Sequence, residues 1–413
     1  MRVLIIGTYP SQTTGYSKVV YNIAKQMSRY PDIRLTVFGI QKFNEINDNY
    51  RLDVPDNVAL WNVVKNDEND FGFGTGSLKN FVLVNDPDVV MVYNDAEVIK
   101  KYIMNLNIIR QDEEAKRMNI NFKIVAYLDQ VHKTQNPESI QYISQNTEHV
   151  FCFTEDWRQN YLSYLRIQKD YLPDFYKDRC SVVKHGIKDI SQIKNTDVET
   201  CKNELNFEKN SFIFVNLNRF ATKKRLDISV ISFVKFLKKC NPKNAYLYFP
   251  AISNKDKNAD ILRNIYRHEL KLNDLEGFEN NLVIRTEPLS DEDIEKIYIA
   301  AEVGLNSCDG EGFGLCNYEH AALGRPQIVT KVGGLVDYFN ENNSIPCVPK
   351  YRSYTDENEM SEVIDPEDMA NGMVKYYQTR SFYNKHSVIL KEIPKKYRWD
   401  IEIDKMVKVW RSV

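Results

Sequence analysis

Residues 306–335, NSCDGEGFGLCNYEHAALGRPQIVTKVGGL, decide the fold. A short apolar run at 303–305 leads into a polar loop, after which a helical pattern opens and stops at Gly324-Arg325-Pro326. A β-branched run follows and predicts another strand. Strand, glycine-bearing loop, helix and strand is the order in which a parallel sheet offers backbone N–H groups to a phosphate. Glu311 stands before this helix and Glu319 inside it, so the stretch carries more than a glycine motif.

Length and composition indicate a globular protein with two domains. At 413 residues the chain exceeds the size at which one hydrophobic core keeps growing. A formal net charge of −2 gives no electrostatic argument for nucleic acid, whose binders carry a basic excess. We therefore expect no nucleic-acid partner.

Cysteine usage and hydropathy indicate the compartment. The seven cysteines are odd in number and scattered, with no CxxC pair, which favours reduced thiols in a cytosol-like compartment. Cys308 and Cys316 flank Glu311, and packing is a much commoner role for such residues than nucleophilic catalysis. Residues 1–7 are too short an apolar run for a signal peptide, and no segment approaches the roughly 20 apolar residues of a membrane helix. We expect a soluble, cytoplasmic protein, and peripheral membrane contact stays open.

The first half of the chain alternates strands and helices. Apolar runs at 3–6 and 35–38 enclose a loop of small residues, 7–15, and a helix with apolar positions at helical spacing. This is the start of a doubly wound α/β sheet, in which ligands bind beyond the carboxyl ends of the strands. Gly15 would let the backbone approach a ligand closely at the helix start, and a plain turn is the competing interpretation.

Two titratable residues follow a buried strand expected at 122–128. Asp129 and His132 come at its carboxyl end, where a doubly wound domain places its working residues. Two such groups, three positions apart, can face one ligand site. The alternative is a helix N-cap for Asp129 and a solvated His132. We favour the functional interpretation.

The alternation restarts at residues 212–215, after a polar stretch, 188–210, that suggests a hinge between domains. Arg219 and Lys224 lie in the basic loop that follows this strand. A cationic loop at a strand end suits a diphosphate, although basic runs are more often solvated faces. The further elements expected are strands at 246–249 and 282–284, a helix with the capping box Ser290 and Asp293, a helix starting at Asp365, and an amphipathic terminal helix at 397–413.

Two other motifs carry less weight. Residues 66–76 are acidic and then glycine-rich, but they lack the GxGxxG spacing and follow no strand, which predicts a mobile surface loop. Asp86-Pro87-Asp88 has the form of a metal-binding DxD motif and directly precedes an apolar run, 89–93. Because a DxD metal site belongs at the far end of a strand, we interpret this motif as the start of one.

The motifs together resemble the retaining, nucleotide-sugar-dependent glycosyltransferases of family four, which have the GT-B fold. The resemblance spans most of the chain and is strongest at 212–335. Arg219 and Lys224 match that family's Arg and Lys at a spacing of five, and Glu311 and Glu319 match its two glutamates. Further matching positions are Asp227, the hinge glycine Gly186, the run Gly312-Phe313-Gly314-Leu315 and the pair Gly333-Gly334. A chlorella-virus member of the family is the source that this resemblance suggests.

The resemblance implies two Rossmann-like doubly wound domains facing across a cleft. It places an acceptor-side domain at 1–190, a nucleotide-sugar-binding domain at 191–395, and a terminal helix at 396–413 that returns to the first domain. The acceptor, whether a glycan, a lipid-linked sugar or a small molecule, would meet first-domain loops such as 41–49 and 66–76.

The resemblance also implies a role for each matched residue. Arg219 and Lys224 would hold the donor diphosphate and stabilise the charge that develops as the glycosidic bond breaks, so no metal or other cofactor is required. Glu319 would accept hydrogen bonds from the ribose, and Glu311 would contact hydroxyls of the transferred sugar. The other donor-binding residues implied are Gly15, which completes the phosphate pocket on closure, Arg285 and Thr286 beside the base, and the loop of Gly312, Phe313, Gly314 and Leu315.

Two positions depart from the family pattern. Many members carry a histidine where the strand at 122–128 ends, touching the donor sugar, and here Asp129 takes that place. Either His132 reaches into the site, or Asp129 does the work with a different sugar selectivity. His185 replaces the asparagine that usually precedes the hinge glycine. These changes affect the identity of the sugar more than the class of reaction.

The function implied is transfer of a sugar from a nucleoside diphosphate to an acceptor hydroxyl, with retention at the anomeric carbon. Mannose from GDP-mannose is the expected donor, and UDP is the next alternative. A nucleotide-sugar epimerase or phosphorylase is a second enzyme hypothesis, although no convincing site for a pyridoxal-carrying lysine is present. A non-catalytic nucleotide-sugar-binding module is the third, favoured slightly by the missing histidine and opposed by the complete set of diphosphate-handling positions.

Overall fold

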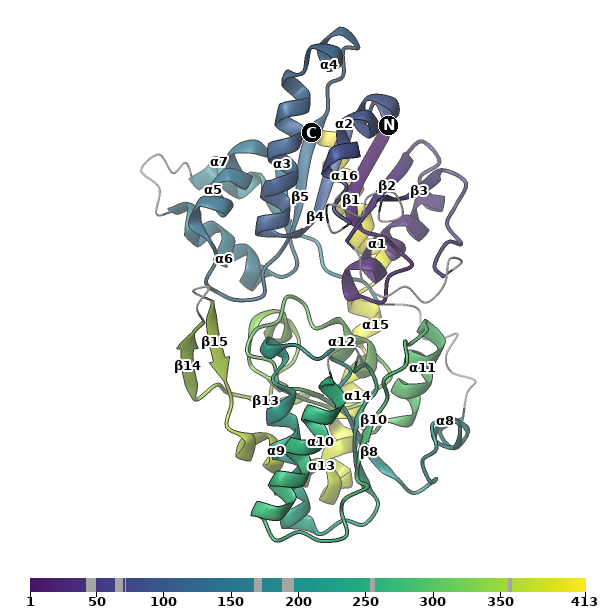
Figure 1. The fold of residues 1–413 in the computed structure, drawn as a ribbon, viewed down its shortest axis with the longest axis vertical. Coiled ribbons are helices and arrows are strands. Elements are labelled where there is room, and N and C mark those ends of the chain that lie inside the picture. Colours follow the sequence, from purple (N-terminus) through teal and green to yellow (C-terminus); the bar gives the residue numbers. More distant parts are fainter. Residues whose placement is uncertain are drawn as a thin grey trace. The chain divides into compact units, whose positions relative to one another are not determined.

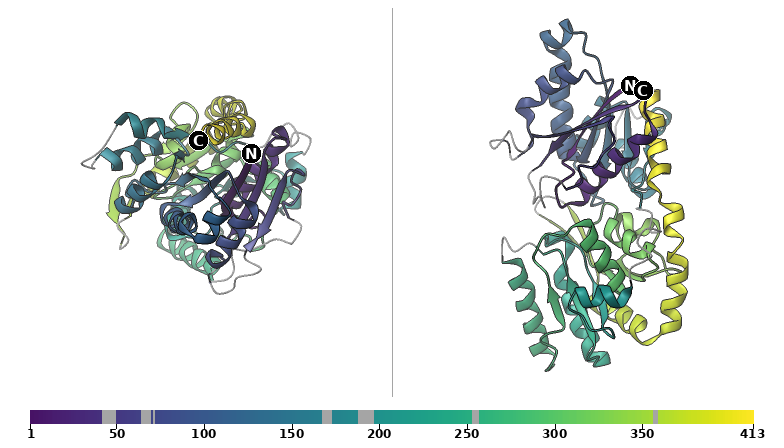
Figure 2. Two further views of the ribbon diagram at one scale, coloured as in Figure 1. Left: turned by 90° about the horizontal axis from the view of Figure 1, so that it is seen from above. Right: turned by 90° about the vertical axis from the view of Figure 1, so that its right-hand side faces the viewer.

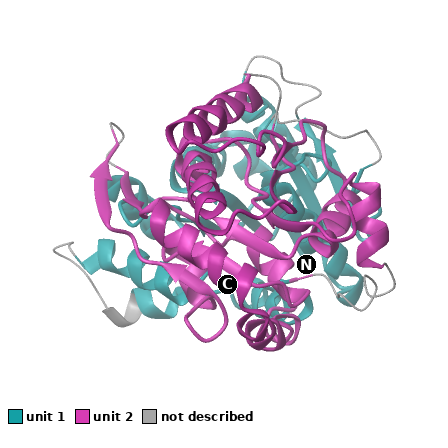
Figure 3. Ribbon diagram, turned by 90° about the horizontal axis from the view of Figure 1, so that it is seen from below, with its two compact units in different colours: residues 1–186, 399–413 teal, residues 187–398 magenta. Residues whose placement is uncertain are grey.

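The computed structural model describes residues 1–41, 50–63, 70, 72–166, 173–187, 197–252, 257–355 and 359–413. The chain forms two compact units (Figure 3). Unit 1 comprises residues 1–186 and 399–413, and unit 2 comprises residues 187–398. Each unit is built around one parallel sheet (Figure 1).

Within the described residues, unit 1 is a seven-stranded parallel sheet with the strand order β3-β2-β1-β4-β5-β6-β7. Its strands are β1 (Arg2–Thr8), β2 (Arg34–Ile40), β3 (Val58–Asn62), β4 (Val89–Asp95), β5 (Lys123–Asp129), β6 (His149–Cys152) and β7 (Cys180–Val182). Its helices are α1 (Gly15–Gln26), η1 (Met27–Arg29), α2 (Thr75–Asn85), α3 (Ala96–Gln111), α4 (Glu113–Arg117), α5 (Pro137–Asn146), α6 (Glu155–Arg166), α7 (Pro173–Asp178) and α16 (Trp399–Ser412). The strand order reverses between β1 and β4, the switch point at which doubly wound sheets bind ligands.

The first strand shows why this sheet forms. Every residue of β1 after Arg2 is buried, as expected for a central parallel strand covered on both faces. Arg2 is exposed and pairs with Asp86 at 2.6 Å and with Asp88 at 3.3 Å. Since β4 begins at Val89, the interpretation of Asp86-Pro87-Asp88 as the start of a strand is confirmed.

The chain passes between the units twice, at 186/187 and at 398/399. The two crossings lie together, because the Ile187 backbone N–H donates to the Tyr397 carbonyl at 2.8 Å. A Cβ at Gly186 would lie 2.3 Å from the backbone nitrogen of Trp399, so only glycine allows this approach.

Helix α16 completes unit 1 by packing against α1. Its buried face includes Glu402, whose carboxylate accepts the Lys184 backbone N–H at 2.9 Å. The carbonyl of Asp32 accepts the terminal amine of Met1 at 2.9 Å, and its carboxylate pairs with Arg411 at 2.9 Å. The two ends of the chain therefore lie close together, as both views of Figure 2 show.

Within the described residues, unit 2 holds a six-stranded parallel sheet with the strand order β10-β9-β8-β11-β12-β13. Its strands are β8 (Phe212–Val215), β9 (Ala245–Phe249), β10 (Leu282–Ile284), β11 (Val303–Asn306), β12 (Gln327–Thr330) and β13 (Ile345–Cys347), and an antiparallel hairpin adds β14 (Tyr351–Tyr354) and β15 (Met360–Val363). Its helices are α8 (Val198–Glu204), η4 (Thr222–Lys224), α9 (Leu226–Cys240), α10 (Asn258–Leu272), α11 (Asp291–Ala300), α12 (Leu315–Ala322), η5 (Gly333–Asp337), α13 (Pro366–Gln378), α14 (Arg380–Leu390) and α15 (Ile393–Lys396).

Successive residues of β8 bury opposite faces of this sheet. Phe214 packs into a cluster with residues of α9, α10 and α13, whereas Ile213 and Val215 pack with residues of α8 and α11. Helices thus cover both faces, and the strand order reverses between β8 and β11. The predicted fold class, two Rossmann-like doubly wound α/β domains, is confirmed.

The structure corrects several local predictions. The loop predicted at 66–76 runs into α2 at Thr75, whose hydroxyl and N–H both bond Asp70, and most of its acidic part lies outside the described residues. The predicted hinge at 188–210 contains α8, although 188–196 lie outside the described residues, as does most of the loop 41–49. The hairpin β14–β15 and the helix α14 were not predicted. Within the described part of the chain, no helix is long and apolar enough to cross a membrane.

Candidate functional site

The candidate site of unit 2 lies at its switch point, beyond the carboxyl ends of β8 and β11. Strand β8 leads to the loop with Arg219 and Lys224, and β11 leads to the loop with Glu311. Because the two strands are neighbours in the sheet, the fold brings both loops to one place.

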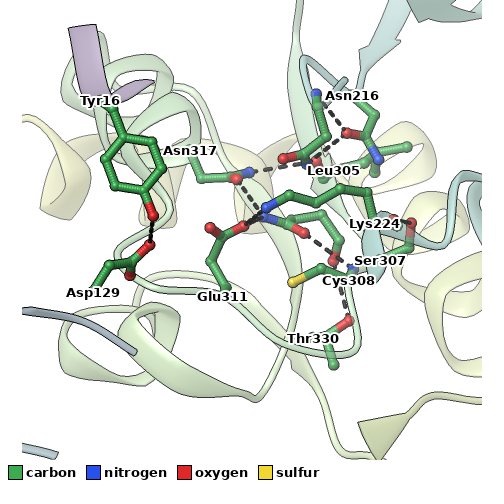
Figure 4. A network of polar contacts seen from close by, with 12 residues as sticks. Tyr16, Asp129, Asn216, Lys224, Leu305, Ser307, Cys308, Glu311, Asn317 and Thr330 are labelled. Atoms are coloured by element: carbon green, nitrogen blue, oxygen red, sulfur yellow. Dashed lines mark hydrogen bonds and ion pairs between the residues drawn. The ribbon is translucent and has the colours of Figure 1, made fainter. Parts of the chain in front are cut away.

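Lys224 and Glu311 form a buried ion pair (Figure 4). Lys224 Nζ lies 2.6 Å from Glu311 Oε2, and each side chain is 12% exposed. Asn306 Nδ2 donates to the same oxygen at 3.2 Å. Among the described residues, no hydrogen bond reaches the other carboxylate oxygen, Oε1. Glu311 therefore bonds the described part of the protein through Oε2, while Oε1 makes no hydrogen bond to it.

Each member of the pair holds the other in its charged form. Burial alone would raise the pKa of Glu311, but Lys224 and Asn306 lower this pKa below its usual value. Burial alone would lower the pKa of Lys224, but Glu311 raises it. The site thus offers a cation for phosphate oxygens and a carboxylate for hydroxyl groups.

Close backbone approaches fix the loop that carries Glu311. Gly334 N donates to the Glu311 carbonyl at 3.0 Å, and a Cβ at Gly334 would lie 2.2 Å from the Gly312 carbonyl oxygen. Gly314 has a φ of +85°, and a Cβ there would meet Leu335 at 2.4 Å. Both contacts require glycine.

The same loop delivers the N-terminus of α12 to the site. Gly314 is the N-cap of α12 and has no side chain to cap it, and the helix begins at Leu315. Its first N–H groups carry the partial positive charge that suits an anion. Phe313 is buried and stacks on Tyr318 at 4.6 Å between ring centroids, so its role in the structure is packing.

The basic loop after β8 presents Arg219 to solvent. Arg219 is exposed and makes no ion pair with any residue that the structure describes. Arg225 adopts a left-handed conformation with a φ of 44° and binds Asp227 through bonds of 3.1 and 2.8 Å. Asp227, matched to the family on sequence, therefore serves to hold Arg225.

The residues predicted to contact the nucleoside lie at the same edge of the sheet. Glu319 is half-buried in α12 and accepts a hydrogen bond from the Tyr298 hydroxyl at 3.2 Å. Arg285 follows β10, two strands from β8 and therefore about 10 Å along the sheet. Its guanidinium pairs with Asp293 at 3.2 Å, and Thr286 next to it is half-buried.

Asp309 joins three segments around the pair. Its N–H donates to the Lys223 carbonyl at 3.0 Å, in the loop that carries Lys224. Its carbonyl accepts the Glu362 N–H at 3.2 Å, and its carboxylate accepts the Ser361 hydroxyl at 2.5 Å. The hairpin strand β15 is thereby tied to the Glu311 loop.

The switch point of unit 1 carries a second polar contact. Tyr16, in the first turn of α1, donates to Asp129 Oδ2 at 2.5 Å (Figure 4). The N-cap of α5 is Asn136, so the N-cap alternative for Asp129 is wrong. His132 is only 3% exposed, so the solvated alternative for this residue is wrong as well.

Gly15 precedes Tyr16 in an open position. Gly15 is exposed, and no heavy atom lies within 4 Å of the position that a Cβ would take there. Packing therefore gives no reason for glycine here, in contrast to Gly314 and Gly334. His185, the other departure from the family pattern, lies in the aromatic core of unit 1, where burial lowers its pKa to about 3.

Residues 214–378 match the family described as glycosyl transferases group 1. The match lies within unit 2. The matched residues include Lys224, Glu311 and Glu319, and they end in α13. No curated protein sequence matches the chain.

Solved structures share the fold over the whole chain. HepE of Anabaena, in complex with UDP and glucose, has a TM-score of 0.70 at 13% identity and covers 100% of both chains. Sucrose-phosphate synthase of Thermosynechococcus elongatus has a TM-score of 0.72 at 12% identity, covering 100% of this chain and 98% of that one. The trehalose-6-phosphate synthase OtsA has a TM-score of 0.70 at 12% identity, covering 100% and 99%. These likenesses show the GT-B fold.

Beside the group 1 pattern, the structure adds residues that the sequence did not reveal as part of a site: Tyr16, Asn306, Asn317 and Asp309. Each contacts a predicted site residue or its neighbour through the tertiary fold, and none belongs to a motif with its own spacing.

All seven cysteines are free, and burial raises the pKa of the Cys308 thiol, which fits a packing role. Among the described residues, no three His, Cys, Asp or Glu side chains cluster as metal ligands do.

Proposed function

We propose that this protein is a retaining, metal-independent glycosyltransferase that moves a sugar from a nucleoside diphosphate to an acceptor hydroxyl. The observation that carries the proposal is the Lys224–Glu311 ion pair at the switch point of unit 2, inside the segment that matches group 1 glycosyl transferases. A sugar diphosphate has a phosphate on one side of its scissile bond and a sugar on the other. The cation can bind the phosphate, and the carboxylate can accept hydrogen bonds from the sugar hydroxyls.

The donor diphosphate takes the place of Glu311 beside Lys224. Arg219, exposed on the same loop, supplies a second cation, and the N-terminus of α12 supplies N–H groups through Gly314 and Leu315. Fixed positive charge of this kind stabilises the leaving diphosphate in the way a divalent metal otherwise would. The reaction therefore needs no metal and no other cofactor.

The remaining residues hold the sugar and the nucleoside. Glu311 contacts hydroxyls of the transferred sugar through Oε1, and Glu319 accepts hydrogen bonds from the ribose. Arg285 and Thr286 lie beside the base. Asp129, held by Tyr16, or His132 contacts the transferred sugar from unit 1.

Retention follows from a same-face route. The acceptor oxygen forms its bond to the anomeric carbon on the face from which the phosphate oxygen departs, and that phosphate oxygen takes the acceptor's proton. The lowered pKa of Glu311 keeps it an ionised hydrogen-bond acceptor and not a proton donor. In this route Glu311 is not the nucleophile, because it contacts the sugar hydroxyls on the face opposite the leaving phosphate. No covalent intermediate on the protein is needed.

GDP-mannose is the donor that the family resemblance suggests. UDP-glucose is the alternative, supported by two similar structures: HepE of Anabaena with UDP-glucose, and a structure described as trehalose-6-phosphate from E. coli with UDP-2-fluoro glucose. The acceptor is a hydroxyl on a glycan, a lipid-linked sugar or a small molecule.

The test combines binding with turnover. The melting temperature is measured against a panel of nucleoside diphosphates, because a ligand at a hundredfold excess over its dissociation constant stabilises the fold by about 2.7 kcal/mol. The sugar nucleotides that carry the selected base are then incubated with the protein, with and without EDTA, and nucleotide release and the anomeric configuration of the product are followed by NMR.

We expect slow release of nucleotide without an acceptor, faster release with one, a retained anomer and no effect of EDTA. Lys224→Ala, Arg219→Ala and Glu311→Ala should each abolish transfer in a folded protein. Tight binding without turnover would indicate a binding module instead, and an epimerised donor would indicate an epimerase. Wild-type rates in all three variants would overturn the proposal.

A further inference from the structure

A chain of uncharged polar side chains runs beneath Glu311 into the core of unit 2. Asn306 Nδ2, which donates to Glu311, also donates to Asn317 Oδ1 at 2.9 Å. Asn317 Nδ2 donates to Gln327 Oε1 at 2.9 Å, and Gln327 Nε2 lies 3.1 Å from His320 Nδ1. The four residues below Glu311 are between 0% and 4% exposed. Buried amides are costly unless they are fully bonded, so this chain calls for an explanation.

Backbone groups fix the orientation of every amide in the chain. Asn306 Oδ1 accepts the Cys308 N–H at 3.1 Å, so its nitrogen must face Glu311. Asn317 Nδ2 also donates to the Leu305 carbonyl at 3.4 Å, and Gln327 Nε2 also donates to the Arg325 carbonyl at 2.8 Å. The donors therefore all point one way along the chain, and a flip of any one amide breaks its three hydrogen bonds.

His320 ends the chain as a neutral ring. Its Nε2 lies 3.2 Å from the Ala301 carbonyl, which can only accept, so the proton sits on Nε2 and Nδ1 accepts from Gln327. Burial, helped by Arg325, lowers the pKa of His320 to about 3. Gly304 leaves room for the chain, because a Cβ there would lie 2.1 Å from Gln327 Oε1.

The chain becomes decisive once Lys224 leaves Glu311. Lys224 and Asn306 are the two described donors to the carboxylate, and both use Oε2. When Lys224 turns to a diphosphate, the amide of Asn306 is the remaining donor that holds Glu311. Both hydrogens of Asn306 Nδ2 are in use, so its position depends on Asn317 as well.

We propose that Asn306 and Asn317 are positioning residues, which hold Glu311 Oε2 so that Oε1 meets the donor sugar after Lys224 has turned to the diphosphate. Gln327 and His320 support them from the core. This inference deepens the proposed function and rests on it for its catalytic consequence. It assigns Glu311 a fixed position that does not depend on its ion pair.

The catalytic test compares Asn317→Ala with a matched control, Asn281→Ala. Asn281 is 6% exposed in the same unit and donates to the Ala245 carbonyl at 2.7 Å, before β10 and outside the chain. Both variants lose a buried amide and should lose similar stability. Asn317→Ala should lower kcat for transfer about 10- to 100-fold, the effect of weakening one hydrogen bond to a charged group, and leave the affinity for the free nucleoside diphosphate unchanged.

Asn281→Ala should keep the wild-type kcat. A wild-type kcat in Asn317→Ala, or an equal loss in both variants, would overturn the inference. A general loss of nucleotide affinity in Asn317→Ala would also overturn it, because it would show structural damage instead of misplacement of Glu311.

A second measurement does not need turnover. The carboxyl carbon of Glu311, assigned in the NMR spectrum by comparison with Glu311→Gln, reports its titration. Asn306→Ala should raise the pKa of Glu311, and Asn317→Ala should raise it less. If the wild-type protein transfers no sugar, the proposed function fails, while this titration still tests the chain; an unchanged titration in Asn306→Ala would overturn it.

Discussion

Lys224 and Glu311 are 87 positions apart in the sequence, and the fold brings Nζ to 2.6 Å from Oε2. Each side chain is only 12% exposed. Both charges are therefore largely removed from water, and each needs the other as a partner. In this pair, Lys224 is the residue that we propose for the donor diphosphate, and Glu311 is the one that we propose for the sugar hydroxyls. A ligand that separates the pair must give each side chain a new partner. This requirement favours a molecule that carries both a phosphate and a hydroxyl group.

The first prediction concerns the stability of this pair. Glu311→Gln leaves the Lys224 ammonium buried without its counter-charge and should lower the free energy of unfolding by about 3 kcal/mol. The double variant Lys224→Met with Glu311→Gln removes both charges and should recover much of this loss. Urea unfolding of the wild type, both single variants and the double variant measures the coupling.

A matched control is Lys331→Met, which breaks the exposed pair of Lys331 with Glu341 in the same unit. It should change the free energy of unfolding by less than about 1 kcal/mol. If the losses in the two single variants simply add in the double variant, the pair is not coupled and the prediction is wrong.

The second prediction concerns how the difference in unfolding free energy between the wild type and Glu311→Gln depends on pH. Burial alone would raise the pKa of Glu311 above 4.5, but Lys224 lowers it, so its stabilising contribution is present above pH 4.5 and is lost as the pH falls through the folded value. Burial alone would lower the pKa of Lys224 below 10.5, but Glu311 raises it, so its contribution is present below pH 10.5 and is lost as the pH rises through the folded value.

The stability difference between the wild type and Glu311→Gln should therefore stay level from about pH 5 to about pH 8. Below that range Glu311 becomes protonated in the wild type, and above it the buried Lys224 of the variant, whose pKa is lowered without Glu311, loses its charge, so the difference shrinks on both sides. Urea unfolding across this range provides the measurement. A difference that changed steadily between about pH 6 and about pH 8 would show that another group controls it.

The third prediction separates packing from ligand approach at Gly15. Since a Cβ there meets nothing within 4 Å, Gly15→Ala should leave the free energy of unfolding unchanged or raise it by up to about 1 kcal/mol. Transfer should nevertheless fall, because we propose that the donor phosphate approaches this backbone. Thermal unfolding and kcat/KM are compared in the same preparation.

Gly76→Ala is the control for Gly15, because Gly76 also lies in the first turn of a helix with nothing within 4 Å of its Cβ position. It should affect neither quantity. Unimpaired transfer by Gly15→Ala would remove this residue from the donor site.

The fourth prediction concerns the tie between the hairpin and the Glu311 loop. Ser361→Ala removes the hydroxyl that donates to Asp309, whose other carboxylate oxygen is buried without a hydrogen bond in the described structure. Leaving a buried carboxylate with one donor fewer should cost about 1–3 kcal/mol. Urea unfolding and hydrogen exchange along β15 measure the loss.

Ser353 offers the control, because it pairs with Ser361 across the hairpin and is exposed. Ser353→Ala should stay within about 0.5 kcal/mol of the wild type. Equal effects of the two substitutions would show that the bond to Asp309 contributes nothing.

Much of the fold could be predicted from the sequence because its strands are buried on both faces. Runs such as those in β1 and β4 are almost continuously apolar, and the helices between them repeat at helical spacing. In a doubly wound sheet the strand ends mark the site, so the order of strands and loops along the chain is enough to assign Lys224 and Glu311 to one place. The capping box of Ser290 and Asp293 and the helix start at Asp365 are confirmed for the same reason, since their signals are local.

The features that sequence did not predict depend on tertiary contacts. Every residue of β14 is exposed, so the strand has no apolar alternation to reveal it. The polar stretch before β8 contains α8, whose buried Cys201 gives only a faint amphipathic signal. Asn306, Asn317 and Gln327 lie within strand or helix patterns. The sequence of such a pattern does not indicate which side chain a buried amide will bond.

The return of the chain to unit 1 sets an order for its synthesis. Residues up to 186 leave the ribosome first, but the helix that buries Ile403, Met406 and Trp410 in unit 1 is made only after all of unit 2. Until then the surface of α1 that receives α16 is uncovered, and the Lys184 N–H has no Glu402 to bond. Unit 2 is contiguous and can fold as it emerges, so the unit that begins first is completed last.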